Sequence, residues 1–112
     1  LEKQYRPYLC LEDVAFFAKG AWWQKQHHIY SMPFYYIDYC IAQVCALQYK
    51  IWMQKDYKEA WQSYLKLCKL SAGDFFVAMI RQVGLKNPFE DGFMKDLVEK
   101  LEKICFNKKE EQ

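Results

Sequence analysis

The sequence predicts an all-α fold with four to five helices, and three observations lead to this prediction. No segment alternates between apolar and polar residues with period two over the length of a strand. Between Pro33 and Gln54 the chain contains neither glycine nor a second proline. Cap and stop signals divide most of the remaining chain into helical segments. Hydrophobic residues make up 53% of the sequence, which argues against a disordered chain.

The first part of the chain predicts short, interrupted elements. Residues 1–11 are expected to form the end of a helix or a loop, because Pro7 interrupts them. Residues 12–26 are compatible with a helix that Gly20 divides.

A long helix is predicted from Pro33 to about Gln54, after a connection over residues 27–32. Pro33 suits the first helical turn, where its missing N–H costs no hydrogen bond, and Ser31 is close enough to cap that turn. Apolar residues occur all round this segment, which is typical of a central buried helix. The residues expected on or near one inward stripe are Ile37, Ile41, Val44, Gln48 and Ile51.

The next helix has a clear start. Asp56 can cap it, with Glu59 as the capping-box partner. Its expected inward face consists of Tyr57, Trp61, Tyr64, Leu65 and Cys68. A tetratricopeptide repeat would recur after about 34 residues. The segment at that distance keeps a helical period but lacks the small and aromatic positions, so this repeat is disfavoured.

Two more helices complete the predicted fold. The stretch SAGD, residues 71–74, stops the preceding helix and offers a new N-cap; a short helix then runs from Phe75 to about Val83 and ends at Gly84. The last helix runs from about Gly92 to Phe106, with an inward face of Phe93, Leu97, Leu101 and Ile104. Residues 1–106 are expected to form a single helical domain, or the C-terminal subdomain of a longer chain, and residues 107–112 a frayed tail.

Charge and hydropathy argue against binding to nucleic acid and against binding to, or crossing, a membrane. Sixteen Lys and Arg against fourteen Asp and Glu give a net charge of +2, with both signs mixed along the chain. This balance offers no electrostatic footprint for nucleic acid and no polybasic face for a membrane surface. From Ile29 to Tyr49 only Asp38 is charged, but Asp38, glutamines and tyrosines would be costly in hydrocarbon. A buried helix is therefore preferred to a membrane helix.

The cysteines indicate a reducing compartment. Their number is odd, and no two form a C-x-x-C pair, so a disulfide framework or a zinc ribbon is disfavoured. Each lies in an apolar context, as small buried thiols do. We therefore expect a cytoplasmic protein. The five cysteines are Cys10, Cys40, Cys45, Cys68 and Cys105.

Metal and nucleophile motifs are missing from the sequence. His27 and His28 are adjacent, so their side chains diverge, and no H-E-x-x-H motif is present. Nothing in the sequence places a cysteine in the electropositive setting that activates a thiol. The chain by itself predicts no metal site and no activated nucleophile.

A different set of side chains could perform chemistry. Tyr36 and Tyr39 are three residues apart, so they share one face of a helix, and Tyr35 is four residues from Tyr39. His28 precedes that helix. One imidazole and two phenols would donate hydrogen bonds to an oxyanion or a peptide carbonyl. The competing interpretation places these tyrosines in the core with satisfied hydroxyls.

Residues 20–48, GAWWQKQHHIYSMPFYYIDYCIAQVCALQ, closely resemble the C-terminal region of oligoendopeptidase F, a zinc peptidase of the thimet oligopeptidase family. The shared pattern is a tryptophan, Q-x-x-H-I, a short spacer and P-F-Y-Y-I-D-Y. Residues 64–102 resemble the closing helices of that family. The resemblance extends from Tyr5 to about Ile104, and P-F-Y-Y-I-D-Y is its specific part.

The resemblance implies a zinc metalloendopeptidase that hydrolyses short peptides, and it implies roles for individual residues. By position, His28, Tyr36 and Tyr39 match the catalytic donors to the scissile carbonyl. Tyr35 and Tyr30 match substrate-binding positions less securely. His27 stands where the family commonly has glycine, which stiffens the connection before His28.

The resemblance also shows what this sequence lacks. Family members carry H-E-x-x-H and a glutamate ligand earlier in the chain, and both are missing here. We therefore expect a C-terminal fragment or a separately made remnant. It would bind no zinc itself and would be inactive without the missing N-terminal catalytic part. A homodimer would cover surface left bare by that part. The alternatives are a non-catalytic helical interaction module and, less favoured without a basic groove, an aromatic platform for single-stranded nucleic acid.

Overall fold

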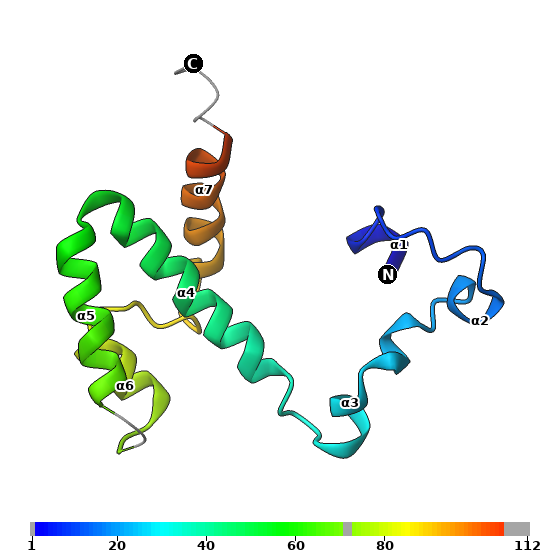
Figure 1. The fold of residues 1–112 in the computed structure, drawn as a ribbon, viewed down its shortest axis with the longest axis horizontal. Helices are drawn as coiled ribbons and strands as arrows, with labels where there is room; N and C mark the ends of the chain where they lie inside the picture. Colours follow the sequence, from blue (N-terminus) through cyan, green and yellow to red (C-terminus); the bar gives the residue numbers. More distant parts are fainter. Residues whose placement is uncertain (1, 71–72, 107–112) are drawn as a thin grey trace. The chain divides into compact units, whose positions relative to one another are not determined.

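The computed structural model describes residues 2–70 and 73–106, and every regular element in these residues is helical (Figure 1). The all-α prediction is confirmed. Four of the helices are about two turns long or longer, and each of the other elements is about one turn long. The elements are α1 (Glu2–Tyr5), α2 (Ala15–Ala18), the 3-10 helix η1 (Trp22–Lys25), α3 (His27–Ser31), α4 (Ile37–Lys55), α5 (Tyr57–Lys69), α6 (Phe76–Gln82) and α7 (Phe93–Phe106).

The chain forms two compact units, residues 1–38 and residues 39–112, called here the N-terminal and the C-terminal unit. The predicted tail at 107–112 lies outside the described residues. Within the described part of the chain, no helix is both long and apolar enough to cross a membrane.

The N-terminal unit consists of short helices joined by turns. Gly20 has a φ of 78° and ends the segment that contains α2, so the predicted division at this glycine is confirmed. Ala21 is the single described residue of this unit that is buried. Local hydrogen bonds and ring contacts, such as the edge-on contact of Phe17 with Trp22 at 5.0 Å, therefore hold much of it together.

The start of α4 differs from the prediction. The helix begins at Ile37 rather than Pro33, because Phe34 has a φ of 69°, which a right-handed helix excludes. The predicted cap by Ser31 is also wrong. Its hydroxyl donates to the backbone carbonyl of His27 at 3.0 Å, within α3.

The prediction of a central buried helix is wrong for α4. Ile37, expected on the inward stripe, is 55% exposed, and Tyr49 is the buried residue of the helix. The inward stripe lies one position away from the predicted one. It consists of Cys45, Tyr49, Trp52 and Met53, which pack in the core of the C-terminal unit.

The start of α5 is predicted correctly and its inward face is not. Asp56 Oδ1 accepts a hydrogen bond from the Glu59 backbone N–H at 2.9 Å, which confirms the cap. The reciprocal bond of the predicted capping box is not formed: the Asp56 backbone N–H donates to the Trp52 carbonyl at 2.9 Å, and the Glu59 carboxylate accepts from the indole of Trp52 at 3.2 Å. The inward face centres on Ala60, which has no exposed surface, whereas Tyr57 is 63% exposed.

The residues expected inside α5 form an outer aromatic face instead. Tyr57 stacks on Trp61 with ring centroids 6.4 Å apart, and Trp61 stacks on Tyr64 at 5.5 Å. These three residues are exposed, as is Cys68, and Leu65 is half-buried. The small Ala60 occupies the packed face, and the large rings lie along its flank, where Tyr64 still contacts the buried Tyr49 at 5.7 Å.

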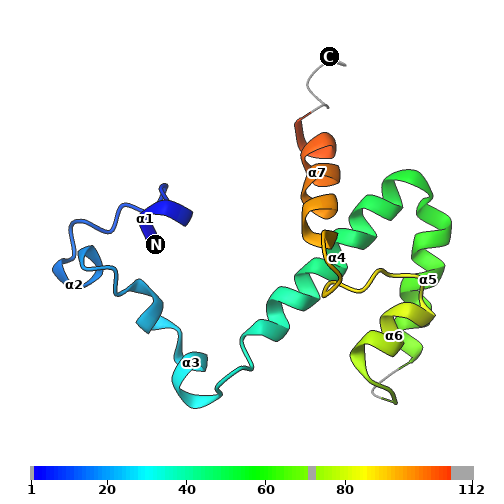
Figure 2. The same ribbon diagram turned by 180° about the vertical axis from the view of Figure 1, so that it is seen from behind.

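The core of the C-terminal unit joins α4, α5 and the end of α6, which Figures 1 and 2 show side by side. Ser63 on α5 donates to the carbonyl of Val83 at 2.5 Å, and its oxygen lies 3.1 Å from the Tyr49 hydroxyl. The side-chain amide of Gln48 makes two hydrogen bonds to the backbone of Lys86, at 2.9 and 3.1 Å. The buried core residues are Tyr49, Ala60, Ile80, Val83 and Leu85.

The last two helices agree largely with the prediction. Gly84 has a φ of 79° just after α6. In α7, Phe93 and Leu97 are buried, while Leu101 and Ile104 are half-buried. The N-cap predicted within SAGD is wrong among the described residues, because the cap position is Phe75 and has no side-chain cap. Asp74 instead accepts hydrogen bonds from the Phe75 backbone at 2.8 Å and the Gln82 amide at 3.2 Å.

Replacing Gly84 with alanine is expected to destabilise the protein more than replacing Gly92. Both glycines have φ near the left-handed region, at 79° and 77°, where a β-carbon costs about 1–2 kcal/mol. At Gly84 the new β-carbon would also lie 3.3 Å from Cη2 of Trp52, whereas it would meet open space at Gly92. Urea unfolding monitored by circular dichroism measures both losses. Equal losses would show that Trp52 does not restrict this turn.

Ionisation of Tyr49 is expected to lower the free energy of unfolding at alkaline pH. Burial raises the pKa of Tyr49, with the Ser63 hydrogen bond acting in the opposite direction. The contribution of the neutral phenol is complete below the ordinary tyrosine pKa of 10.0. It is lost as the pH rises through the higher pKa of the folded state. Urea unfolding at about pH 8 and about pH 11 measures this loss.

Tyr49→Phe should reduce that alkaline loss, and Tyr8→Phe, at an exposed tyrosine, should leave it unchanged. The same loss in Tyr49→Phe and in the unmodified protein would exclude Tyr49 as its source.

Candidate functional site

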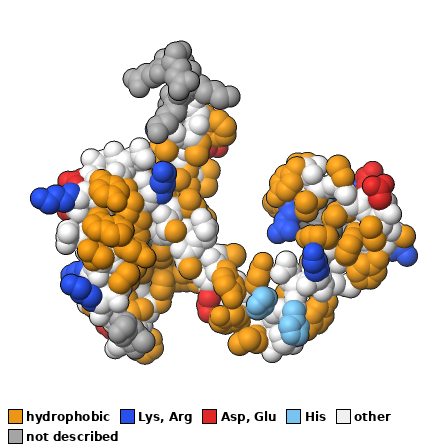
Figure 3. Space-filling model, in the orientation of Figure 1, with side chains coloured by type: hydrophobic (Ala, Val, Ile, Leu, Met, Phe, Trp, Pro, Cys, Tyr) orange, Lys and Arg blue, Asp and Glu red, His pale blue; other side chains and the backbone are white. Residues whose placement is uncertain are grey.

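The predicted site residues lie on three neighbouring segments of the chain. His28 and Tyr30 belong to α3, and Tyr35 and Tyr36 belong to the turns that follow it. Tyr39 belongs to the first turn of α4. The four tyrosines are exposed and His28 is half-buried. Figure 3 shows histidine side chains at the surface of the N-terminal unit with hydrophobic side chains around them.

The structure brings His28 together with two of the tyrosines. The imidazole stacks on the ring of Tyr35 with centroids 6.2 Å apart, and it lies 5.6 Å from the ring of Tyr36 with a 34° tilt. The left-handed residue Phe34 lies in the turn between α3 and these tyrosines. We call His28, Tyr35 and Tyr36 the imidazole–phenol cluster.

Tyr30 and Tyr39 are placed differently. Tyr30 stacks on Trp23 of η1, with centroids 6.2 Å apart. Tyr36 precedes the first residue of α4, so the expected shared helical face of Tyr36 and Tyr39 is not formed. Tyr39 lies in the C-terminal unit, and its convergence with His28 stays a prediction.

A pocket of about 260 Å³ lies beside the cluster, within the N-terminal unit. Tyr36 belongs to both the cluster and the pocket wall. We call this cavity the indole pocket. Its wall consists of Tyr5, Arg6, Trp22, Trp23, Gln26, Ile29 and Tyr36.

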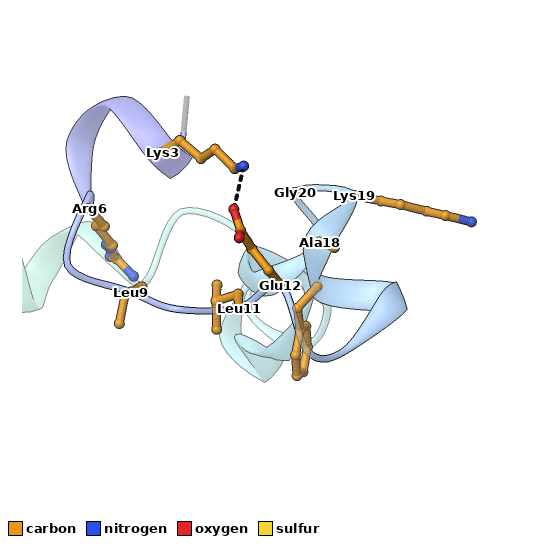
Figure 4. Close-up of a pocket in the computed structure, with 9 residues that line it drawn as sticks. Lys3, Arg6, Leu9, Leu11, Glu12, Ala18, Lys19 and Gly20 are labelled. Carbon is orange, nitrogen blue, oxygen red and sulfur yellow. Dashed lines mark hydrogen bonds and ion pairs between the residues drawn. The ribbon is translucent and has the colours of Figure 1, made fainter.

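A second pocket of the same unit, of about 280 Å³, is drawn in Figure 4 and shares Arg6 with the indole pocket. Lys3 donates to Glu12 in its wall at 2.8 Å. The hydrogen bond of this ion pair raises the pKa of Lys3 and lowers that of Glu12. Both side chains are exposed, so we assign the pair no large effect on stability.

The described side chains do not suit a zinc ion. In residues 2–70 and 73–106, no three His, Cys, Asp or Glu side chains gather closely enough to hold a metal.

Two solved structures are similar to the chain. One is a crystal structure of an oligoendopeptidase F, with 40% identity and a TM-score of 0.80 over 92% of this chain. The other is PZ peptidase A with an inhibitor, with 40% identity and a TM-score of 0.79 over 90% of this chain. The predicted resemblance to oligoendopeptidase F is confirmed. None of the family models matches the sequence, and none of the curated proteins does.

The oligoendopeptidase F resemblance concerns one helical part of a longer protein. The chain spans 18% of the length of each of the two peptidases. With 40% identity, the likeness includes side chains as well as the path of the backbone.

The indole pocket was not predicted from the sequence, although Trp23 and Gln26 belong to the recognised pattern. A signal was present in the spacing of Trp22, Gln26 and Ile29 at i, i+4 and i+7. The position of Arg6 in this wall could not be predicted from the sequence, because only the loops after α1 bring it to these residues.

Proposed function

We propose that this chain forms the substrate-cleft segment of a larger zinc-dependent metalloendopeptidase that hydrolyses peptide bonds in short peptides. The observation that supports this most strongly is the 40% identity, at a TM-score of 0.80, to an oligoendopeptidase F over 92% of the chain. A second peptidase, PZ peptidase A, gives nearly the same values.

In this proposal, His28, Tyr36 and Tyr39 donate hydrogen bonds to the scissile carbonyl as it becomes an oxyanion. Imidazole and phenol groups can donate without carrying charge, and fixed donors stabilise developing negative charge with little reorganisation. The 5.6 Å separation of the His28 and Tyr36 rings supports a common target for these two groups. Tyr35, stacked on His28, and Tyr30 would contact the peptide on either side.

The zinc ligands and the general base would come from an N-terminal catalytic part that this chain lacks. The missing H-E-x-x-H motif supports this division. Zinc would supply the activated water of hydrolysis, so the chain alone would be inactive. The proposed partners are short peptides and the catalytic part, and the apolar surface left bare by that part would allow a homodimer. The cysteine usage supports a cytoplasmic location.

One observation favours a second candidate, a non-catalytic interaction module. The stacked rings of Tyr57, Trp61 and Tyr64 are exposed along α5. Aromatic residues are enriched in protein interfaces. A face of this kind would serve a binding protein as well as a peptidase segment, so activity has to separate the two.

A chimeric enzyme tests the proposal. Residues 1–112 replace the corresponding segment of an oligoendopeptidase F of known structure, and hydrolysis of a quenched fluorescent peptide is measured. We expect an active, folded chimera. Tyr39→Phe in that chimera should lower kcat by about 100-fold, with little change in KM, because its hydroxyl acts in the transition state.

Tyr8→Phe is the matched control, since Tyr8 is exposed, does not belong to the cluster, and lines neither the indole pocket nor the pocket of Figure 4. It should keep the full kcat. A chimera that folds, as shown by its melting temperature, but cleaves nothing would favour the interaction module. Full activity in Tyr39→Phe would remove the proposed role of that hydroxyl, and cleavage by the isolated chain would contradict the division of labour.

A further inference from the structure

We propose that the indole pocket binds the C-terminal residue of a peptide. The terminal α-carboxylate would pair with Arg6, and an apolar side chain would lie against Trp22 and Trp23. This inference rests on the proposed function for its choice of a peptide as the ligand, and it adds the part of the peptide that is recognised.

The chemistry of the pocket wall suits a group that is apolar with one negative charge. Tyr5, Trp22, Trp23, Ile29 and Tyr36 provide aromatic and aliphatic surface. Arg6 is the one charged residue in the wall, and Gln26 adds an amide. A guanidinium presents a planar fork of donors that matches a carboxylate in a bidentate pair.

Among the described side chains, no acid forms an ion pair with Arg6. The ion pairs between described side chains involve Lys3, Arg81, Lys86 and Lys100, and Arg6 is in none of them. The indole pocket contains no Asp or Glu. A carboxylate entering it would therefore meet a single positive charge and no repelling group.

The neighbouring pocket, which Arg6 also lines, is a poorer site for this ligand. Its wall contains the carboxylate of Glu12, which is already bonded to Lys3 (Figure 4). Lys3 and Lys19 line it as well, so charge alone does not separate the two pockets, and the difference lies in their apolar surface. The wall of the neighbouring pocket holds one aromatic ring, that of Phe17, so it offers less surface to a large apolar side chain.

The size of the indole pocket fits one amino-acid residue. Pockets for drug-sized ligands span about 300–1,000 Å³, and this one has about 260 Å³. Tyr36 lies in its wall and its ring is 5.6 Å from His28. A peptide anchored by its last residue would thus place one of its final peptide bonds near the proposed donors. The inferred preference is for short peptides with a free carboxyl end, cleaved close to that end.

Binding to the 112-residue chain tests the inference without any hydrolysis. The probe is N-acetyl-Leu-Phe with a free carboxylate, and the readout is the four indole N–H signals in a ¹H–¹⁵N NMR spectrum. The signals of Trp22 and Trp23 should shift, and those of Trp52 and Trp61, in the other unit, should stay in place. The C-terminal amide of the same peptide should bind at least about tenfold more weakly, because it lacks the charge.

A third peptide, N-acetyl-Glu-Phe amide, carries its carboxylate on a side chain. Binding of this peptide as tight as that of the free acid would overturn the assignment to the chain terminus. Equal binding of the amide would overturn the role of the carboxylate altogether. Shifts of Trp52 and Trp61 alone, or no shift, would overturn the pocket.

Variants of the chain test whether Arg6 provides the positive charge that binds the carboxylate. Arg6→Gln should weaken binding of the free acid by roughly 10–100-fold, and Arg6→Lys should restore part of it. Lys19→Gln removes an exposed cation of the same unit whose side chain extends away from the other residues drawn in Figure 4, and it should leave binding unchanged. Unchanged shifts elsewhere in the spectrum show that a variant is folded. A folded Arg6→Gln chain with full affinity would overturn the inference.

These outcomes are independent of the chimera experiment. If the chimera is active but the isolated chain does not bind peptides with a free carboxyl end, the peptidase proposal stands and the proposed role of the pocket is excluded. Binding by the isolated chain with an inactive chimera would keep the pocket and remove the peptidase proposal.

Discussion

The C-terminal unit depends on a hydrogen-bonded chain from the phenol of Tyr49 through the hydroxyl of Ser63 to the carbonyl of Val83. Tyr49 and Val83 are buried, so their polar atoms need partners inside the protein. The Ser63 hydroxyl has one proton, which it gives to Val83, and it therefore accepts from Tyr49. One small side chain thus connects α4, α5 and the end of α6. The fully buried Ala60, one turn earlier on α5, leaves room for this close packing.

This junction decides which surfaces face outward. With Ala60 and Ser63 turned inward, the rings of Tyr57, Trp61 and Tyr64 stack on one another along the exposed flank of α5, and Tyr64 at the edge of this row also contacts the buried Tyr49. An exposed aromatic face of this kind is consistent with a chain that corresponds to 18% of the length of two peptidases. In a longer protein, such a face would be available to pack against other parts of the molecule.

The N-terminal unit positions its side chains by different means. With Ala21 as its single buried residue among those described, it has little core, and turns bring its rings together. Phe34, whose backbone is in the left-handed region, lies in the turn between α3 and the two tyrosines whose rings contact His28. His28, Tyr35 and Tyr36 are thus close both in sequence and in space, whereas Arg6 reaches the indole pocket from the far end of the unit's sequence.

The sequence by itself determined the features that depend on neighbouring residues. The helical class, the Asp56 cap, the Gly84 stop and the inward face of α7 follow from local hydrogen bonds, backbone freedom and periodicity. The motif around His28 also predicted the family resemblance that the structural comparison confirmed.

Only the tertiary structure decided which side of α4 and α5 faces the core. Both helices have large apolar residues on more than one side, so periodicity could not choose between the aromatic face and the side with Ala60. The choice depends on how closely two helices approach, which small residues permit and large rings prevent. The indole pocket likewise required the fold, because Arg6 meets Trp22 and Ile29 through loops whose path no local pattern specifies.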